Sequence, residues 1–342
     1  MSHRFILAFS VFIVSISAGA QPGGNTVFNS MDIPVSSRAA ALGGHFIAMK
    51  DGDITLGAIN PSLLDSSSTG KLALGFVDYF AGSHSGYASY AHPLNEKVTL
   101  GAGLQYLSYG TMNETDITGQ TIGQFSAGDY QFTAGAGYRI DSVFSAGVNL
   151  KLMYSDIAGY SALAVATDYS ATFVHPDKKF TAAAVLRNIG VSLDSYLGEK
   201  QKLPFDIQLG ITKRLAHAPF RFVLTATNLQ KWDLTYDDGS TQTIDPVTGA
   251  VVTNNQFGFG DKLMRHLTLG SEFIISPNIF LRIGYNYRVR QELKVSERPG
   301  TAGFTYGFEC RVKRFQLGYA RAIYHLAGPS NHFTLSTSLR NW

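Results

Sequence analysis

Residues 130–154, YQFTAGAGYRIDSVFSAGVNLKLMY, contain two runs in which apolar and polar side chains alternate. Apolar residues occupy every second position in Tyr130–Ile140, and they do so again in Phe144–Tyr154. Period-two alternation is typical of a β-strand whose two faces meet different surroundings. Asp141-Ser142, between the runs, is a polar turn of the kind that joins antiparallel neighbours. The stretch therefore predicts a β-hairpin with unusually long strands.

The same alternation recurs from Lys71 to Trp342, in about fourteen runs. Val98–Tyr109, Phe205–Ile211 and Ile279–Val289 are clear examples. Many runs have about ten residues, the length that a tilted strand needs to cross a bilayer, whereas strands of soluble proteins average about five or six. Tyrosines lie near the ends of several apolar stripes, as they do at the interfaces of membrane barrels.

The connections between the runs alternate in length. The short connections are Pro93–Glu96, Asp141–Ser142, Pro176–Asp177, Ala216–Ala218, Pro277–Asn278 and Val312–Lys313. The long connections are Thr111–Phe125, Gly190–Lys202, Lys231–Lys262 and Gln291–Pro299. Bacterial outer-membrane barrels have short periplasmic turns and long surface loops. We therefore predict an all-β chain, a transmembrane β-barrel of about fourteen antiparallel strands in the bacterial cell outer membrane. Counts of about twelve or sixteen stay open, because the runs before residue 93 are short.

The N-terminal region does not share this pattern. Residues 1–20 are predicted to be a signal peptide, because an apolar run follows His3 and Arg4 and ends at Ala18-Gly19-Ala20. The alternative is a buried N-terminal strand or helix. Residues 21–70 are predicted to form a plug segment, and residues 71–342 the barrel.

Two helical pieces are expected in the plug segment. Pro34–Gly44 predicts one short helix, with Ser36 or Ser37 as its N-cap and a glycine pair as its end. Asp53–Leu64 predicts a second helical turn that breaks at Asn60-Pro61. The segment either fills the barrel lumen, which would otherwise be open to water, or lies outside it as a periplasmic extension.

Composition excludes several classes of function. The net charge of +3 and the lack of a Lys/Arg cluster give no support for nucleic acid as a partner. No stretch reaches about eighteen uninterrupted apolar residues, so no membrane helix is expected. Cys310 is the one cysteine and is expected on an apolar strand face, so no internal disulfide forms. Serine-hydrolase, zinc-protease and nucleotide-binding motifs are absent, and we expect no enzyme activity, cofactor or metal.

Several positions are expected to face the lumen. Gly101-Ala102-Gly103 and Gly135-Ala136-Gly137 lie inside strands, where we expect them to relieve crowding in the lumen rather than to bind a nucleotide. The predicted lumen cations are Arg139, Lys151, Arg282, Arg288 and Arg290. They would serve either a hydrated or plug-contacting interior, which is normal for barrels, or a cationic passage for anions.

The longest connection opens with KWDLTY at residues 231–236. Lys231, Trp232, Asp233 and Tyr236 are the candidate partner-binding residues, because tryptophan and tyrosine are typical interface anchors. The alternative for Trp232 is a place in the outer aromatic girdle of the barrel.

Seven stretches resemble the PorQ-type outer-membrane proteins of the type IX secretion system, within the wider group of PorV and FadL-like barrels. They are Gly24–Asn29, Pro34–Gly44, Asn60–Leu64, Phe125–Tyr130, Leu203–Gly210, His217–Phe222 and Leu229–Tyr236. The resemblance implies a fourteen-stranded barrel with an N-terminal plug. It also implies a non-enzymatic scaffold or anchor in the surface attachment complex, which contains PorU, PorV and PorZ and fixes secreted proteins to lipopolysaccharide.

The partners implied are outer-membrane lipid, a PorZ-like surface protein held by the extracellular loops, and the other complex members PorU and PorV. Three alternatives stay open. The chain could be a FadL-like transporter of hydrophobic small molecules, a PorV-like shuttle that binds the C-terminal sorting domains of secreted proteins, or a soluble β protein.

Overall fold

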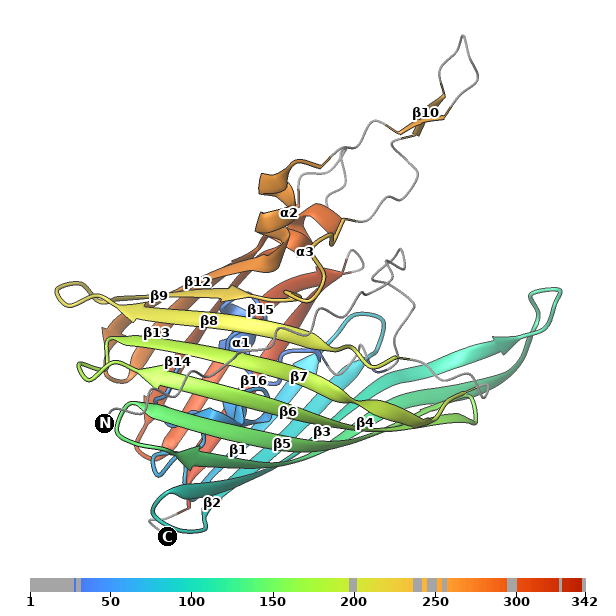
Figure 1. Ribbon diagram of the computed structural model, residues 1–342. Coiled ribbons are helices and arrows are strands. Elements are labelled where there is room, and N and C mark those ends of the chain that lie inside the picture. Colours follow the sequence, from blue (N-terminus) through green and yellow to red (C-terminus); the bar gives the residue numbers. More distant parts are fainter. Residues whose placement is uncertain are drawn as a thin grey trace, which may run out of the picture.

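The computed structural model describes Phe28 and residues 32–196, 202–235, 242–244, 251–253, 257–293, 300–325 and 328–339. Fourteen antiparallel strands form a closed barrel (Figure 1), and β1 closes the ring against β16. The first seven strands of the ring are β1 (Lys71–Asp78), β2 (His84–Pro93), β3 (Val98–Thr115), β4 (Thr121–Arg139), β5 (Phe144–Ile157), β6 (Tyr160–Val174) and β7 (Phe180–Asp194). The others are β8 (Asp206–Arg214), β9 (Phe220–Ala226), β12 (Leu267–Ser276), β13 (Ile279–Asn286), β14 (Phe304–Val312), β15 (Phe315–His325) and β16 (Gly328–Ser338). The predicted fold class and strand count are confirmed.

The strands alternate between an apolar outer face and a polar inner face. In β5, Val148, Leu150 and Leu152 are exposed on the outside, while Asn149 and Lys151 between them are buried inside. A soluble protein rarely leaves an apolar surface of this extent in water. Lipid removes that cost, and the closed ring leaves no strand edge with unpaired backbone groups.

All six predicted short turns join consecutive strands at one end of the barrel (Figure 1). We call this end the inner mouth and the opposite end the outer rim, because short turns face the periplasm in bacterial barrels. Two predicted long loops are partly strand. Thr111–Phe125 is wrong as a loop, since the ladder continues through Met112 and Phe125 and only residues 116–120 connect β3 to β4. Gly190–Lys202 overlaps the end of β7.

The third long connection, Lys231–Lys262, carries a small separate sheet of β10 (Gln242–Ile244) and β11 (Val251–Thr253), and α2 (Phe259–His266) begins inside it. The predicted strand Ile279–Val289 is too long, because α3 (Tyr287–Glu292) follows β13. The Asn286 side chain accepts a hydrogen bond from Val289 N and starts this helix. Arg288 and Arg290 therefore lie on α3, and their predicted place on a lumen-facing strand is wrong.

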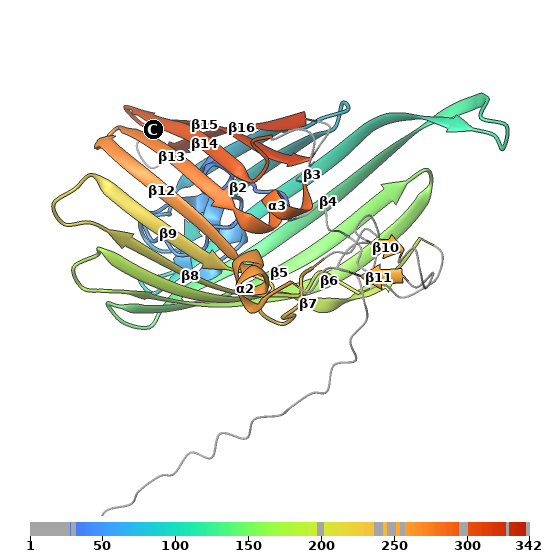
Figure 2. The ribbon, with the colours of Figure 1, turned by 90° about the horizontal axis from the view of Figure 1, so that it is seen from above.

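Residues 32–70, the described residues directly before β1, lie inside the barrel (Figures 1 and 2). They contain α1 (Ser37–Ala41) and two 3-10 helices, η2 (Ile54–Ala58) and η3 (Pro61–Leu63). As predicted, Ser36 caps α1, and Gly43 and Gly44 end it with φ values of +96° and +93°. We call the described residues 32–70 the plug; residues 1–20, the predicted signal peptide, lie outside the described residues, as does Trp342.

Candidate functional site

A charged cluster fixes one side of the plug to the barrel wall. Arg38 of α1 lies 2.7 Å from the Asp51 carboxylate and 3.2 Å from that of Asp53, both within the plug. It also lies 3.6 Å from the carboxylate of Glu272 on β12. Arg38 is 3% exposed and Glu272 is fully buried. The plug and the wall thus share a buried ion pair.

The cluster continues along the wall. Glu272 binds Arg221 of β9 at 2.6 Å and Arg282 of β13 at 2.7 Å. Arg282 also binds Glu309 of β14 at 2.6 Å, and Glu309 binds Arg311 at 3.0 Å. Four arginines and four carboxylates therefore balance in charge. We call these residues, with Arg38, Asp51 and Asp53, the ionic cluster. Because each buried charge has a partner, the cost of its desolvation is offset.

Neutral hydrogen bonds fix the opposite side of the plug. The Ser62 backbone N–H donates to the Ser170 hydroxyl at 3.0 Å, and the Ser145 hydroxyl donates to the Ser62 carbonyl at 2.8 Å. The Ser62 and Thr172 hydroxyls lie 2.7 Å apart. Asn149 donates to the carbonyl of Gly57 at 3.1 Å. We call these contacts, on β5 and β6, the neutral contact.

Wall glycines allow the plug backbone to approach closely. A Cβ atom on Gly147 of β5 would overlap the backbone of Pro61 and Ser62. One on Gly284 of β13 would overlap the backbone at Leu42 and Gly43. Of the predicted lumen glycines, Gly101 faces Leu64 and Gly137 faces the Leu64 carbonyl, as expected for positions that relieve crowding.

The structure places the predicted lumen cations in different surroundings. Lys151 is buried and binds Asp168 of β6 at 2.7 Å, and Arg282 belongs to the ionic cluster. Arg139 lies on the inward face of β4, opposite Ser145, but at the exposed end of the strand, where it donates to the Glu96 carbonyl at 3.0 Å. Sequence reasoning missed Glu272 and Glu309. The available signal was an isolated acidic residue at an inward position of an apolar strand.

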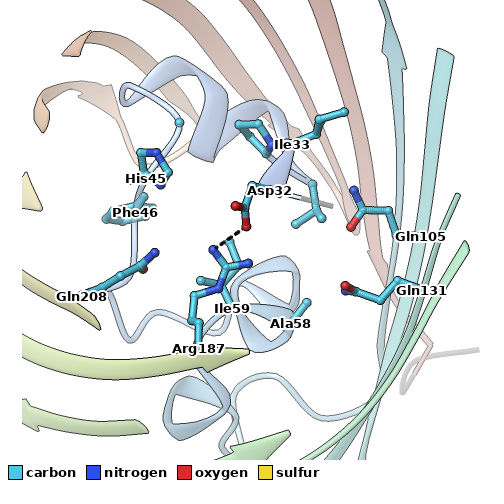
Figure 3. Close-up of a pocket in the computed structure, with 13 residues that line it drawn as sticks. Asp32, Ile33, His45, Phe46, Ala58, Ile59, Gln105, Gln131, Arg187 and Gln208 are labelled. Carbon is cyan, nitrogen blue, oxygen red and sulfur yellow. Dashed lines mark ion pairs between the residues drawn. The ribbon is translucent and has the colours of Figure 1, made fainter. Parts of the chain in front are cut away.

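A small pocket lies between the plug and the wall, where side chains from both converge (Figure 3). Asp32 of the plug and Arg187 of β7 pair across it at 3.2 Å. The other polar side chains around it are His45, Gln105, Gln131 and Gln208. Its cavity of about 20 Å³ has room for about one water molecule. The pocket is therefore too small and too polar to hold a hydrocarbon.

Three of the four predicted partner-binding residues lie together near α2 at the outer rim. The Trp232 ring is 49% exposed and lies 5.2 Å from the Phe259 ring, and it stacks on His266 at 5.7 Å. Lys231 precedes it and is partly buried. Tyr236 lies outside the described residues. We call Trp232, Phe259 and their neighbours on α2 the rim platform.

An ion pair ties this loop to α2, since Lys262 Nζ lies 2.6 Å from an Asp233 carboxylate oxygen. Hydrogen bonds from Lys262 and from Thr235 hold the pKa of Asp233 well below its usual range. The ion pair therefore holds the segment that carries Trp232 against α2.

Within the described ranges, no group of three or more His, Cys, Asp or Glu side chains could hold a metal ion. None of the helices in the described part of the chain is long and apolar enough to cross a membrane.

Several solved structures resemble this chain. The Pseudomonas putida toluene transporter TodX is 14% identical with a TM-score of 0.53, over 89% of this chain and 96% of TodX. A TodX deltaS2S3 mutant, described as a monoaromatic hydrocarbon channel, is 14% identical with a TM-score of 0.52, over 88% of this chain and 96% of that one. A Pseudomonas aeruginosa FadL homologue is 10% identical with a TM-score of 0.50, over 90% of this chain and 98% of that one.

The fold is that of the FadL-type outer-membrane barrels. The localisation expected from the sequence, the bacterial outer membrane, agrees with this fold. No family model matches the chain, and no curated protein matches its sequence. At these identities the likeness concerns the fold alone. The identity of any bound molecule has to be inferred from the site.

Proposed function

We propose that this barrel is a sealed, non-enzymatic anchor in the outer membrane that holds a surface protein at its outer rim. The observation that carries the proposal is the filled lumen, since the ionic cluster and the neutral contact fix the plug on opposite sides. The space left at the Asp32–Arg187 pair has room for about one water molecule. We infer that a barrel with a filled lumen works by binding a partner on its outer surface and not by passing molecules through the lumen.

The partner proposed is a PorZ-like surface protein of the type IX attachment complex, in company with PorU and PorV. The sequence stretches that resemble the PorQ-type proteins support this identity, and the rim platform supplies a braced aromatic anchor for it. Exposed tryptophans that are held in place are enriched among the residues that dominate binding energy.

The test is co-purification of the tagged protein in detergent, with mass spectrometry of what it retains. We expect one surface protein to be recovered, and Trp232→Ala to lower its recovery about ten-fold, as the loss of a dominant contact does. Tyr160→Ala, which removes an exposed aromatic ring at the outer end of β6, is the matched control and should change nothing. Normal attachment of secreted proteins in a clean deletion strain would refute the anchor function.

A second candidate is transport of hydrophobic small molecules. The likeness to TodX and to the FadL homologue favours it more directly than it favours the anchor, because those proteins are described as a toluene transporter and a FadL homologue. It requires the plug or the wall to rearrange, since Gln105, Gln131 and Gln208 make the present pocket polar. Loss of toluene uptake in the deletion strain, with surface attachment intact, would establish it over the anchor.

A PorV-like shuttle is distinguished by the same co-purification. A shuttle recovers many secreted proteins through their sorting domains, whereas an anchor recovers one fixed partner.

A further inference from the structure

A second cavity lies at the inner mouth, between the plug and the turn that joins β14 to β15. It measures about 140 Å³, several times the roughly 10–15 Å³ that one water needs by the same measure. Its walls carry Arg38, Asp51, Gly52, Asp53, Lys71, Arg311, Lys313, Arg314, Phe315 and Gln316. It is thus a built space that opens toward the periplasm, and neither candidate function uses it.

Arg38 and Arg311 of the lining are already paired in the ionic cluster, and the lining carries three further cationic side chains, Lys71, Lys313 and Arg314. Both carboxylates, Asp51 and Asp53, are already bound by Arg38. Asp51 and Asp53 also interact electrostatically with Lys71, so they neutralise the lysines only in part.

The two lysines have donors to spare. Lys71 Nζ donates to the Gly52 carbonyl at 2.7 Å, and an ammonium group has three N–H donors. Within the described residues, neither Lys71 nor Lys313 makes an ion pair. Lys313 is held at the tip of the turn with a φ of 54°. Two lysines at the edge of a polar cavity attract a compact anion.

We propose that this cavity binds a phosphate group, with Lys71 and Lys313 as its principal ligands and Arg314 beside them. Lysine and arginine are the usual phosphate ligands in proteins, and a tetrahedral oxyanion accepts donors from several directions at once. The proposal does not depend on which of the two candidate functions is correct.

The phosphate has two sources. Val312 and Phe315, on either side of the turn, are both exposed on the apolar outer face, so a lipid lying against them could turn its head group into the cavity. Free phosphate could enter from the periplasm. Both present the same chemistry to the lysines.

The experiment is a calorimetric titration of the full-length protein in detergent, first with inorganic phosphate and then with a short-chain phosphatidic acid below its micelle concentration. The test variant is Lys71→Gln with Lys313→Gln. The matched control is Lys97→Gln with Lys178→Gln, which removes the same charge from the same end of the barrel, and Lys178 also sits in a turn with a φ of 55°.

We expect the test variant to weaken phosphate binding at least about ten-fold, and the control to change it less than about two-fold. Tighter binding of phosphatidic acid than of inorganic phosphate identifies the lipid as the source, and the reverse identifies free phosphate. Equal weakening in both variants would mean general attraction to a basic surface, and no saturable binding would mean no site; each overturns the proposal. Unchanged heat-modifiable migration on a gel shows that the variants fold.

Discussion

The plug contacts the wall on two opposite sides, and the two sides use different chemistry. Toward β5 and β6 it is held by hydroxyl, amide and backbone groups around Ser62. Toward β9, β12, β13 and β14 it is held by Arg38 and the carboxylates and arginines of the ionic cluster. Both sides bury polar groups between the plug and the wall. They differ in what happens when one partner is removed.

A neutral hydrogen bond contributes little net stability, because folding exchanges it for hydrogen bonds to water. A buried ion pair can also contribute little as a whole, but an unpaired buried charge is expensive. A single substitution in the neutral contact should therefore lower the stability of the plug only slightly. A single substitution in the ionic cluster should lower it strongly.

Arg38→Met should release α1 from the wall. The substitution removes the buried arginine that Asp51, Asp53 and the fully buried Glu272 share, at a cost of about 3–5 kcal/mol. Hydrogen exchange of the α1 amides measures this loss, while the strand amides report on the barrel. Arg311→Met, at the exposed end of the same cluster, is the control and should have a small effect. Equal effects of the two variants would contradict a special role for burial.

Gly147→Ala should disturb the neutral side by crowding. The added Cβ would meet the backbone of Pro61 and Ser62, which cannot turn aside as a side chain does, and overpacking typically costs about 1–3 kcal/mol. Gly103→Ala is the control, because its Cβ would lie 3.4 Å from the Tyr87 hydroxyl, an ordinary contact. Faster exchange of the plug amides only in the first variant is the expected result. The same exchange rates in both would show that the close approach does not matter.

Ser62→Ala should weaken the neutral contact by about 1 kcal/mol, since it removes one hydroxyl and keeps both backbone hydrogen bonds to the wall. The same exchange experiment measures it. A loss as large as that of Arg38→Met would erase the distinction between the two sides.

The ion pair of Asp233 and Lys262 provides a comparison, because water reaches it more easily than it reaches the pair of Arg38 and Glu272. The pKa of Asp233 is lowered in the folded protein, so its stabilising effect is present above the unfolded pKa and is lost as the pH falls through the folded pKa. Lys262→Gln should cost about 0.2–1 kcal/mol at neutral pH, and less in acid. Protection of the Thr235 amide, which donates to Asp233 at 3.0 Å, reports the change. A pH-independent effect would exclude an electrostatic origin.

Much of the fold could be predicted from the sequence, because each membrane-spanning strand alternates apolar and polar residues. Alternation in a segment such as Phe144–Tyr154 fixes which side chains face lipid, and polar turns fix where strands end. The extension of β3 and β4 was missed because the outer part of this hairpin stands beyond the lipid, where Asn113 and Gln124 pair and no apolar stripe is required.

The ionic cluster could not be predicted from local pattern. It joins Arg38 of the plug to residues on four strands from the second half of the chain, and only ring closure around the plug brings them together. The end of β13 at Asn286 was missed for a related reason. An asparagine cap competes with strand continuation, and Tyr287–Val289 keeps the alternation that a strand would show.

The central claim is that the plug stays seated while the protein works, and a covalent lock tests it most directly. The Ser62 and Thr172 hydroxyls lie 2.7 Å apart, so Ser62→Cys with Thr172→Cys places two thiols within disulfide reach, in a chain that also carries Cys310→Ala. The measurement is the amount of secreted protein attached to the surface of a deletion strain that carries the locked barrel, before and after reduction. We predict the wild-type amount in both states. Attachment that is absent while the disulfide is closed and returns on reduction would contradict the account, because it would mean that the plug must move.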